Sequence, residues 1–115
     1  MESGIHINVS ATDYDKTSKV IIHQLSLLEE MVHSQDDFVM TDSEFAFGWH
    51  FFVLSVNKSL VQKLAETMGP DFEKLKGKGT EKKFLAWLTK NVESKSPRFK
   101  LAIKEEMESS KFGIF

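Results

Sequence analysis

The 115-residue chain contains no cysteine, a single arginine, two prolines and six glycines. Without cysteine it can hold no disulfide framework, no thiolate metal ligand, no iron–sulfur cluster and no cysteine nucleophile. The scarcity of proline and glycine excludes collagen-like and low-complexity sequence. Hydrophobic residues make up 41% of the chain and charged residues 28%, a balance typical of a globular domain. We therefore predict one domain over residues 1–115.

Long apolar runs are also missing. The longest, from Phe45 to Leu54, is interrupted by Gly48 and His50. It is much shorter than the ~20 residues that a membrane-spanning helix needs. The first residues have neither the basic nor the apolar region of a secretory signal. We expect a cytoplasmic protein that does not associate with membranes.

Charge is unevenly distributed along the chain. Residues 1–57 have nine acidic side chains against two lysines, whereas residues 58–115 have 13 basic against eight acidic side chains. The candidate basic face, for polyanions or an acidic partner, consists of Lys78, Lys82, Lys83, Lys90 and Lys100. Arginine's planar fork suits base edges and phosphates, so its near absence predicts weak binding without sequence preference. A solvated surface, or attraction between the two halves of one fold, would explain the same charges.

Two patterns describe the first third of the chain. Between residues 5 and 9, isoleucine and valine alternate with polar residues, which predicts a short strand or an extended arm. From Thr17 to His33, apolar residues recur with helical spacing, and Asp13 or Asp15 can cap the start of that helix.

The strongest helical signal runs from Thr41 to Met68. Thr41 and Glu44 match a capping box, apolar residues from Val53 onward keep helical spacing, and Gly69-Pro70 is a stop signal. We predict one long central helix here. The alternative is a pair of strands, because aromatic and β-branched residues are dense at 38–40 and 45–53. The segment 41–44, however, lacks the glycine of a tight hairpin turn.

Three shorter helices are predicted to follow. One begins at Pro70, one runs from Thr80 to Val92, and the last runs from Ser96-Pro97 to Gly113. The expected fold class is all-α, a bundle of four to five helices around the central helix, with a short N-terminal extended arm. The alternative class is α+β, with strands near 5–9, 38–40 and 45–53. Trp49 and Trp87 are expected in the core.

No motif predicts catalysis, a metal site or a cofactor. The segment Gly77-Lys78-Gly79-Thr80 resembles part of a phosphate loop, but it lacks the upstream glycine and the preceding strand. Glu30 and His33 have the spacing of a di-iron ligand pair, but no second such motif exists. The four histidines are too scattered to indicate a catalytic base. We therefore assign no catalytic residue, no metal and no cofactor.

The end of the chain is a second candidate interaction element. Gly113 suits the position after a helix, and Phe112, Ile114 and Phe115 have no apolar neighbour in the preceding turn. These three side chains either fold back onto the core or dock into another chain.

Size, polarised charge and the lack of a catalytic constellation favour a non-enzymatic protein–protein interaction module, such as an inhibitor, immunity or adaptor protein. One alternative is a nucleic-acid-associated protein that uses the lysine-rich segment from Lys74 to Lys104. Another is a small helical metal or ligand carrier that uses the segment Phe45–Val56. Another protein is the expected partner, and non-specific binding of polyanions is possible.

Overall fold

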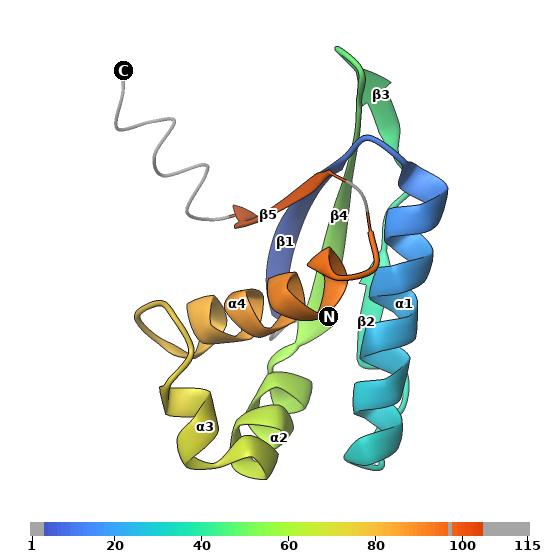
Figure 1. Ribbon diagram of the computed structural model, residues 1–115. Coiled ribbons are helices and arrows are strands. Elements are labelled where there is room, and N and C mark those ends of the chain that lie inside the picture. Colours follow the sequence, from blue (N-terminus) through green and yellow to red (C-terminus); the bar gives the residue numbers. More distant parts are fainter. Residues whose placement is uncertain (1–3, 97, 105–115) are drawn as a thin grey trace.

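The computed structural model describes residues 4–96 and 98–104, and these residues form an α+β fold. In chain order the elements are β1 (Gly4–Ala11), α1 (Tyr14–Met31), β2 (Phe38–Met40), β3 (Glu44–Ala46), β4 (Trp49–Asn57), α2 (Lys58–Met68), α3 (Pro70–Glu73), α4 (Thr80–Glu93) and β5 (Phe99–Ile103) (Figure 1).

The described strands form one antiparallel sheet in the order β2-β4-β1-β5, and β3 extends it by pairing with the first residues of β4. The helix α1 connects β1 to β2, and β4 lies between these two strands. The helices α2, α3 and α4 connect β4 to β5, and β1 lies between those two strands. Two split β-α-β units joined in this way have the connectivity of ferredoxin-like folds.

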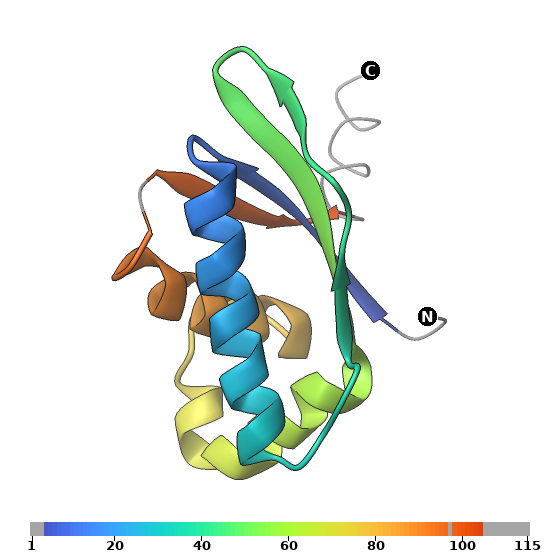
Figure 2. The same cartoon turned by 90° about the vertical axis from the view of Figure 1, so that its right-hand side faces the viewer.

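The hydrophobic core lies between the sheet and the helices. Burial alternates along β1, where Ile7 is fully buried and its sequence neighbours are half-buried. Ile21 of α1 and Leu88 of α4 are also fully buried, so both helices pack on the same face of the sheet. Figure 2 shows this layer of helices on one side only. No described element covers the opposite side, which we call the open face.

The all-α prediction is wrong, and with it the bundle around a helix from Thr41 to Met68. That segment contains β3, β4 and only one helix, α2, which begins at Lys58. The residue Asn57 ends β4 and is also the N-cap of α2, so no loop separates strand from helix. The observed strands match the α+β alternative more closely, since they include 38–40 and most of 45–53.

The predicted capping box is also wrong, because Thr41 belongs to a β-bulge. Its N–H donates to the Val53 carbonyl (2.9 Å), and its Oγ1 accepts from the Val53 N–H (2.9 Å). Residues 41–43 lie opposite residues 52–53, so β4's partner strand contains one extra residue. Such a bulge bends the strand and increases its twist.

The predicted last helix is wrong in its described part. Residues 99–103 form β5, which pairs with β1 from Phe99↔Ala11 to Ile103↔Ile7. The predicted interaction tail, Phe112, Ile114 and Phe115, lies outside the described residues.

Several helix boundaries are confirmed. Asp13 is the N-cap of α1, and its side chain accepts from the Lys16 N–H (3.1 Å). Gly69 ends α2 with a positive φ of 59°, a conformation that glycine adopts without steric cost. In the described part of the chain, no helix has both the length and the apolar character required to cross a bilayer.

Candidate functional site

The strands β3 and β4 form a hairpin that extends past the end of β1 (Figure 1). Ala46 pairs with Trp49, so only Phe47 and Gly48 form the turn. Both have positive φ, 55° and 82°, as a type I′ turn requires. Glycine suits the second position, but the first usually holds asparagine, aspartate or glycine. A phenylalanine there is a steric outlier.

Phe47 is also almost entirely in solvent. Its side chain is 98% exposed, and Phe45 on β3 is 65% exposed. We call these two residues the hairpin tip. In the free protein, Phe47 combines a strained backbone with an aromatic ring that has almost no burial. Its contribution to folding therefore does not explain its presence at this turn.

A small aromatic cluster connects the hairpin tip to the core. The Phe45 ring lies 4.7 Å from the His50 ring, which lies 6.0 Å from Tyr14 at the start of α1. Tyr14 in turn packs edge-on against the buried Phe52, with ring centroids 5.1 Å apart. The His50 Nδ1 atom is buried and has no hydrogen-bond partner in the described part of the structure. The hairpin tip is thus supported from the helix side of the sheet.

The other side of the hairpin belongs to the open face. Trp49 and Phe51 are alternate residues of β4 and lie opposite in direction to the buried Phe52. Trp49 is half-buried and Phe51 is 41% exposed, so the prediction that Trp49 is a core residue fails. The Lys100 Nζ lies 5.8 Å from the centre of the Trp49 ring, within the range of a cation–π contact. Trp87 is half-buried and packs against the core.

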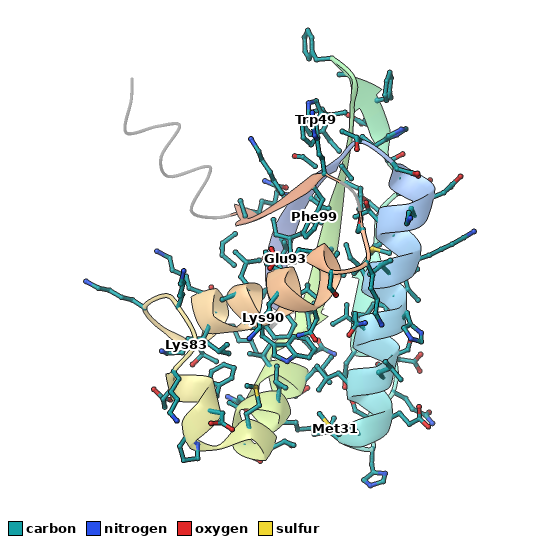
Figure 3. The ribbon with its side chains drawn as sticks, in the orientation of Figure 1. Met31, Trp49, Lys83, Lys90, Glu93 and Phe99 are labelled. Atoms are coloured by element: carbon teal, nitrogen blue, oxygen red, sulfur yellow. The ribbon has the colours of Figure 1, made fainter. Side chains whose placement is uncertain are left out.

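The structure separates the lysines of the candidate basic face. Lys83 and Lys90 belong to α4, well away from Trp49 near the end of the hairpin (Figure 3). The Lys83 Nζ donates to the Glu73 and Leu75 carbonyls, at 2.9 and 3.2 Å. Lys100 lies on β5, and its amine approaches Trp49 on the open face. Lys100 therefore does not form one surface with Lys83 and Lys90.

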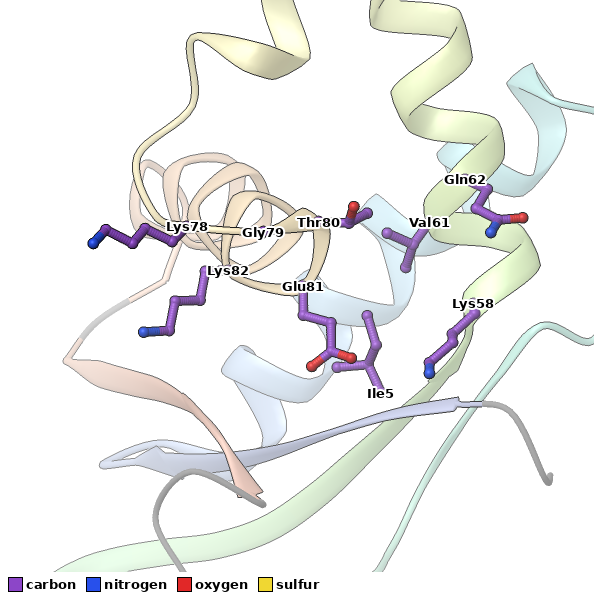
Figure 4. A pocket seen from close by; sticks show the side chains of 9 residues that line it. All are labelled: Ile5, Lys58, Val61, Gln62, Lys78, Gly79, Thr80, Glu81 and Lys82. Carbon is purple, nitrogen blue, oxygen red and sulfur yellow. The ribbon is translucent and has the colours of Figure 1, made fainter. Parts of the chain in front are cut away.

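Lys78 and Lys82 do come together, around a pocket of about 410 Å³ at the start of α4. The apolar residues Ile5 and Val61 also line it, as does a third lysine, Lys58. Figure 4 shows the Glu81 carboxylate between Lys58 and Lys82. The charge of this pocket is therefore mixed, and all of its lysines are on the solvent-exposed surface.

The described residues contain no group of three or more histidine, aspartate or glutamate side chains that could hold a metal ion. Glu30 and His33, whose spacing resembles that of a di-iron ligand pair, lie at the end of α1 and just beyond it. They have no third ligand among these residues.

The sequence contains a signal for the hairpin tip, the dipeptide Phe47-Gly48 between two runs rich in aromatic and β-branched residues. A glycine in this setting is typical of a two-residue hairpin turn. The glycine of the turn is Gly48, and not a residue of the segment 41–44.

What the chain does must be inferred from these residues. No family model, no curated protein and no solved structure matches it.

Proposed function

We propose that the protein is a non-enzymatic binding module that docks onto a protein partner through the hairpin tip. The observation that supports this is Phe47, a 98% exposed aromatic residue with a φ of 55°. Strained backbone persists where it serves a function, and buried aromatic anchors dominate the energy of protein interfaces. The compartment remains the sequence-based expectation, the cytoplasm.

The charge around the hairpin tip favours one kind of partner. The chain has no lysine or arginine from Val20 to Asn57, and Asp42 and Glu44 are exposed beside the tip. An anionic membrane attracts lysine and arginine, so it is a poor match for this surface. A protein with an apolar pocket and a basic rim would accept the phenylalanine ring and attract both carboxylates.

Site-specific photo-cross-linking tests this proposal. A photoreactive amino acid is placed at position 47 or, as a control, at position 27, where Leu27 is 46% exposed on α1. We expect one discrete adduct from position 47 and none from position 27. The purified adduct protein should bind the wild type at least tenfold more tightly than F47N, whereas L27N should bind like the wild type. Equal adducts from both positions, or adducts only with a second copy of the chain, would refute the proposal.

Binding of polyanions by lysines is a second candidate. One observation favours it, since Lys78, Lys82 and Lys58 line the same pocket. K78E and K82E should then each weaken heparin binding, with K90E as the control. Unchanged heparin binding in both variants would exclude this candidate.

A further inference from the structure

The open face of the sheet combines aromatic, hydroxyl and basic side chains on neighbouring strands. Cross-strand pairs share one face of a sheet, so the register and the burial pattern assign its residues. β4 contributes Trp49 and Phe51, β1 contributes Ser10, and β5 contributes Lys100. The residues that β1, β4 and β5 place on this face are not acidic, and the one acidic residue that the described strands place there is Glu44 of β3, the register partner of Phe51.

A row of register partners crosses four strands, from Glu44 through Phe51 and Ser10 to Lys100. Ser10 is the register partner of both Phe51 and Lys100. Partners in adjacent antiparallel strands are about 5 Å apart, so an aromatic ring, a hydroxyl and an ammonium group are neighbours here. Trp49 precedes Phe51 by two residues, about 7 Å along the strand. The two rings thus stand side by side on the same surface.

The edge of this surface is basic. Arg98 precedes β5, Lys100 lies within it and Lys104 follows it, so three cations occur along one edge strand. The opposite edge of the sheet carries the acidic residues Asp42 and Glu44. At this end of the molecule, the acidic first half and the basic second half of the chain therefore supply opposite edges of the sheet.

We propose that the open face binds single-stranded nucleic acid, with two bases stacked on Trp49 and Phe51 and the backbone phosphates along Arg98, Lys100 and Lys104. Aromatic rings accept any base by its flat face, and cations beside them follow the phosphates. Ser10 lies between rings and cations, within reach of a sugar or a base edge. A duplex keeps its bases stacked inside and offers no ring for Trp49 and Phe51. This site is separate from the hairpin tip.

Fluorescence anisotropy with labelled 12-nucleotide oligo(dT) and oligo(rU) at about 50 mM salt tests this proposal. We expect the single strands to bind more tightly than a duplex of the same length. W49A and F51A should each lower the affinity at least about fivefold, because each removes a stacking surface. Three phosphate contacts predict that a plot of the logarithm of the binding constant against the logarithm of the salt concentration has a slope of about −2. K100E removes one contact and should bring this slope closer to zero by about 0.7.

Matched variants identify the surface. F47N and K90E, which change the hairpin tip and a lysine on α4, should bind oligonucleotides like the wild type. If W49A does not fold, F51S at the more exposed position gives the same test. Binding that survives W49A and F51A, loss of binding with K90E, or no binding at 50 mM salt would each overturn the proposal. Loss of oligonucleotide binding leaves protein docking through Phe47 intact, so the two proposals can fail separately.

Discussion

Phe47 is the described residue whose side chain is least suited to its backbone conformation. A non-glycine residue in the left-handed region costs of order 1 kcal/mol or more, and a β-branched or bulky residue is the least suited to it. Most residues with such a backbone recover the cost through packing or a side-chain hydrogen bond. Phe47, at 98% exposure, does not recover it in the free protein.

Replacing Phe47 by asparagine should therefore stabilise the isolated protein. Asparagine tolerates a positive φ and, followed by Gly48, forms the favoured type I′ sequence. We expect the free energy of unfolding to rise by about 0.5–1 kcal/mol, measured by urea denaturation. The conservative F47Y serves as the control and should leave the stability unchanged. A loss of stability in F47N would show that the phenylalanine ring packs against the protein.

A second residue-scale prediction concerns His50. Its Nδ1 atom is buried without a partner among the described residues, and an unsatisfied buried polar atom costs about 1–3 kcal/mol. H50F keeps an aromatic ring between Phe45 and Tyr14 and removes that atom. Thermal denaturation should show a higher melting temperature for H50F. A lower melting temperature would indicate that the imidazole has a hydrogen-bond partner in solution.

At the scale of elements, the segment 41–68 shows why the fold class was predicted incorrectly. A half-buried strand normally alternates apolar and polar residues, but β4 has Trp49, Phe51 and Val53 on the open face as well as apolar residues on the core face. Alternation is therefore lost, and the run resembles a buried helix. β4 continues into α2 without a loop. The helical spacing of apolar residues in α2 is therefore continuous with the apolar run of β4, and the two together resemble one long helix from Thr41.

Other elements could be predicted because a local interaction determines them. The side chain of Asp13 fixes the start of α1, and Gly69-Pro70 fixes the end of α2. β5 could not be predicted in this way, since its strand state depends on pairing with β1, more than 85 residues earlier in the chain. The open face could not be predicted for the same reason, because Lys100 and Trp49 meet only through the pairing of β5 with β1 and of β1 with β4. The hairpin tip, by contrast, has a local signal, the dipeptide Phe47-Gly48.

A prediction about the stability of the packed helices concerns Lys83 of α4. Its ammonium group donates to the Glu73 carbonyl at the end of α3 and to the Leu75 carbonyl just beyond it, and a charged donor strengthens such bonds. K83M should lower the free energy of unfolding by about 1 kcal/mol, since the group is partly exposed and solvent replaces some of the interaction. K90M, on the same helix, should change it by less than half as much. Equal effects would mean that the two hydrogen bonds contribute nothing specific.

At the scale of the whole molecule, the sheet can be tested by engineered cross-links in a chain that has no cysteine of its own. Ser10 and Phe51 are register partners, and adjacent strands bring Cα atoms to the 4.4–6.8 Å that a disulfide requires. S10C/F51C should form an intramolecular disulfide under mild oxidation, detected as a mass loss of about two hydrogens. S10C paired with S26C, on the outer side of α1, should not. Failure of the first pair would contradict the β1–β4 register.

The two edges of the sheet carry opposite charge and different apolar groups, which suggests that the molecule presents two separate surfaces. The hairpin tip lies beside the acidic edge, and on the open face the basic edge reaches the aromatic pair through Lys100, whose Nζ lies 5.8 Å from the centre of the Trp49 ring. The sheet thus holds both surfaces on one rigid support, which reduces the ordering cost of docking.

Competition between purified proteins tests most directly whether the chain retains Phe47 for binding. Unlabelled wild type or F47N is added in excess to the cross-linking reaction at position 47, and the yield of the adduct is measured. We expect the wild type to abolish the adduct and F47N, although more stable to urea, to leave it nearly unchanged. If F47N competes as well as the wild type, the hairpin tip is not the docking element and the account is wrong.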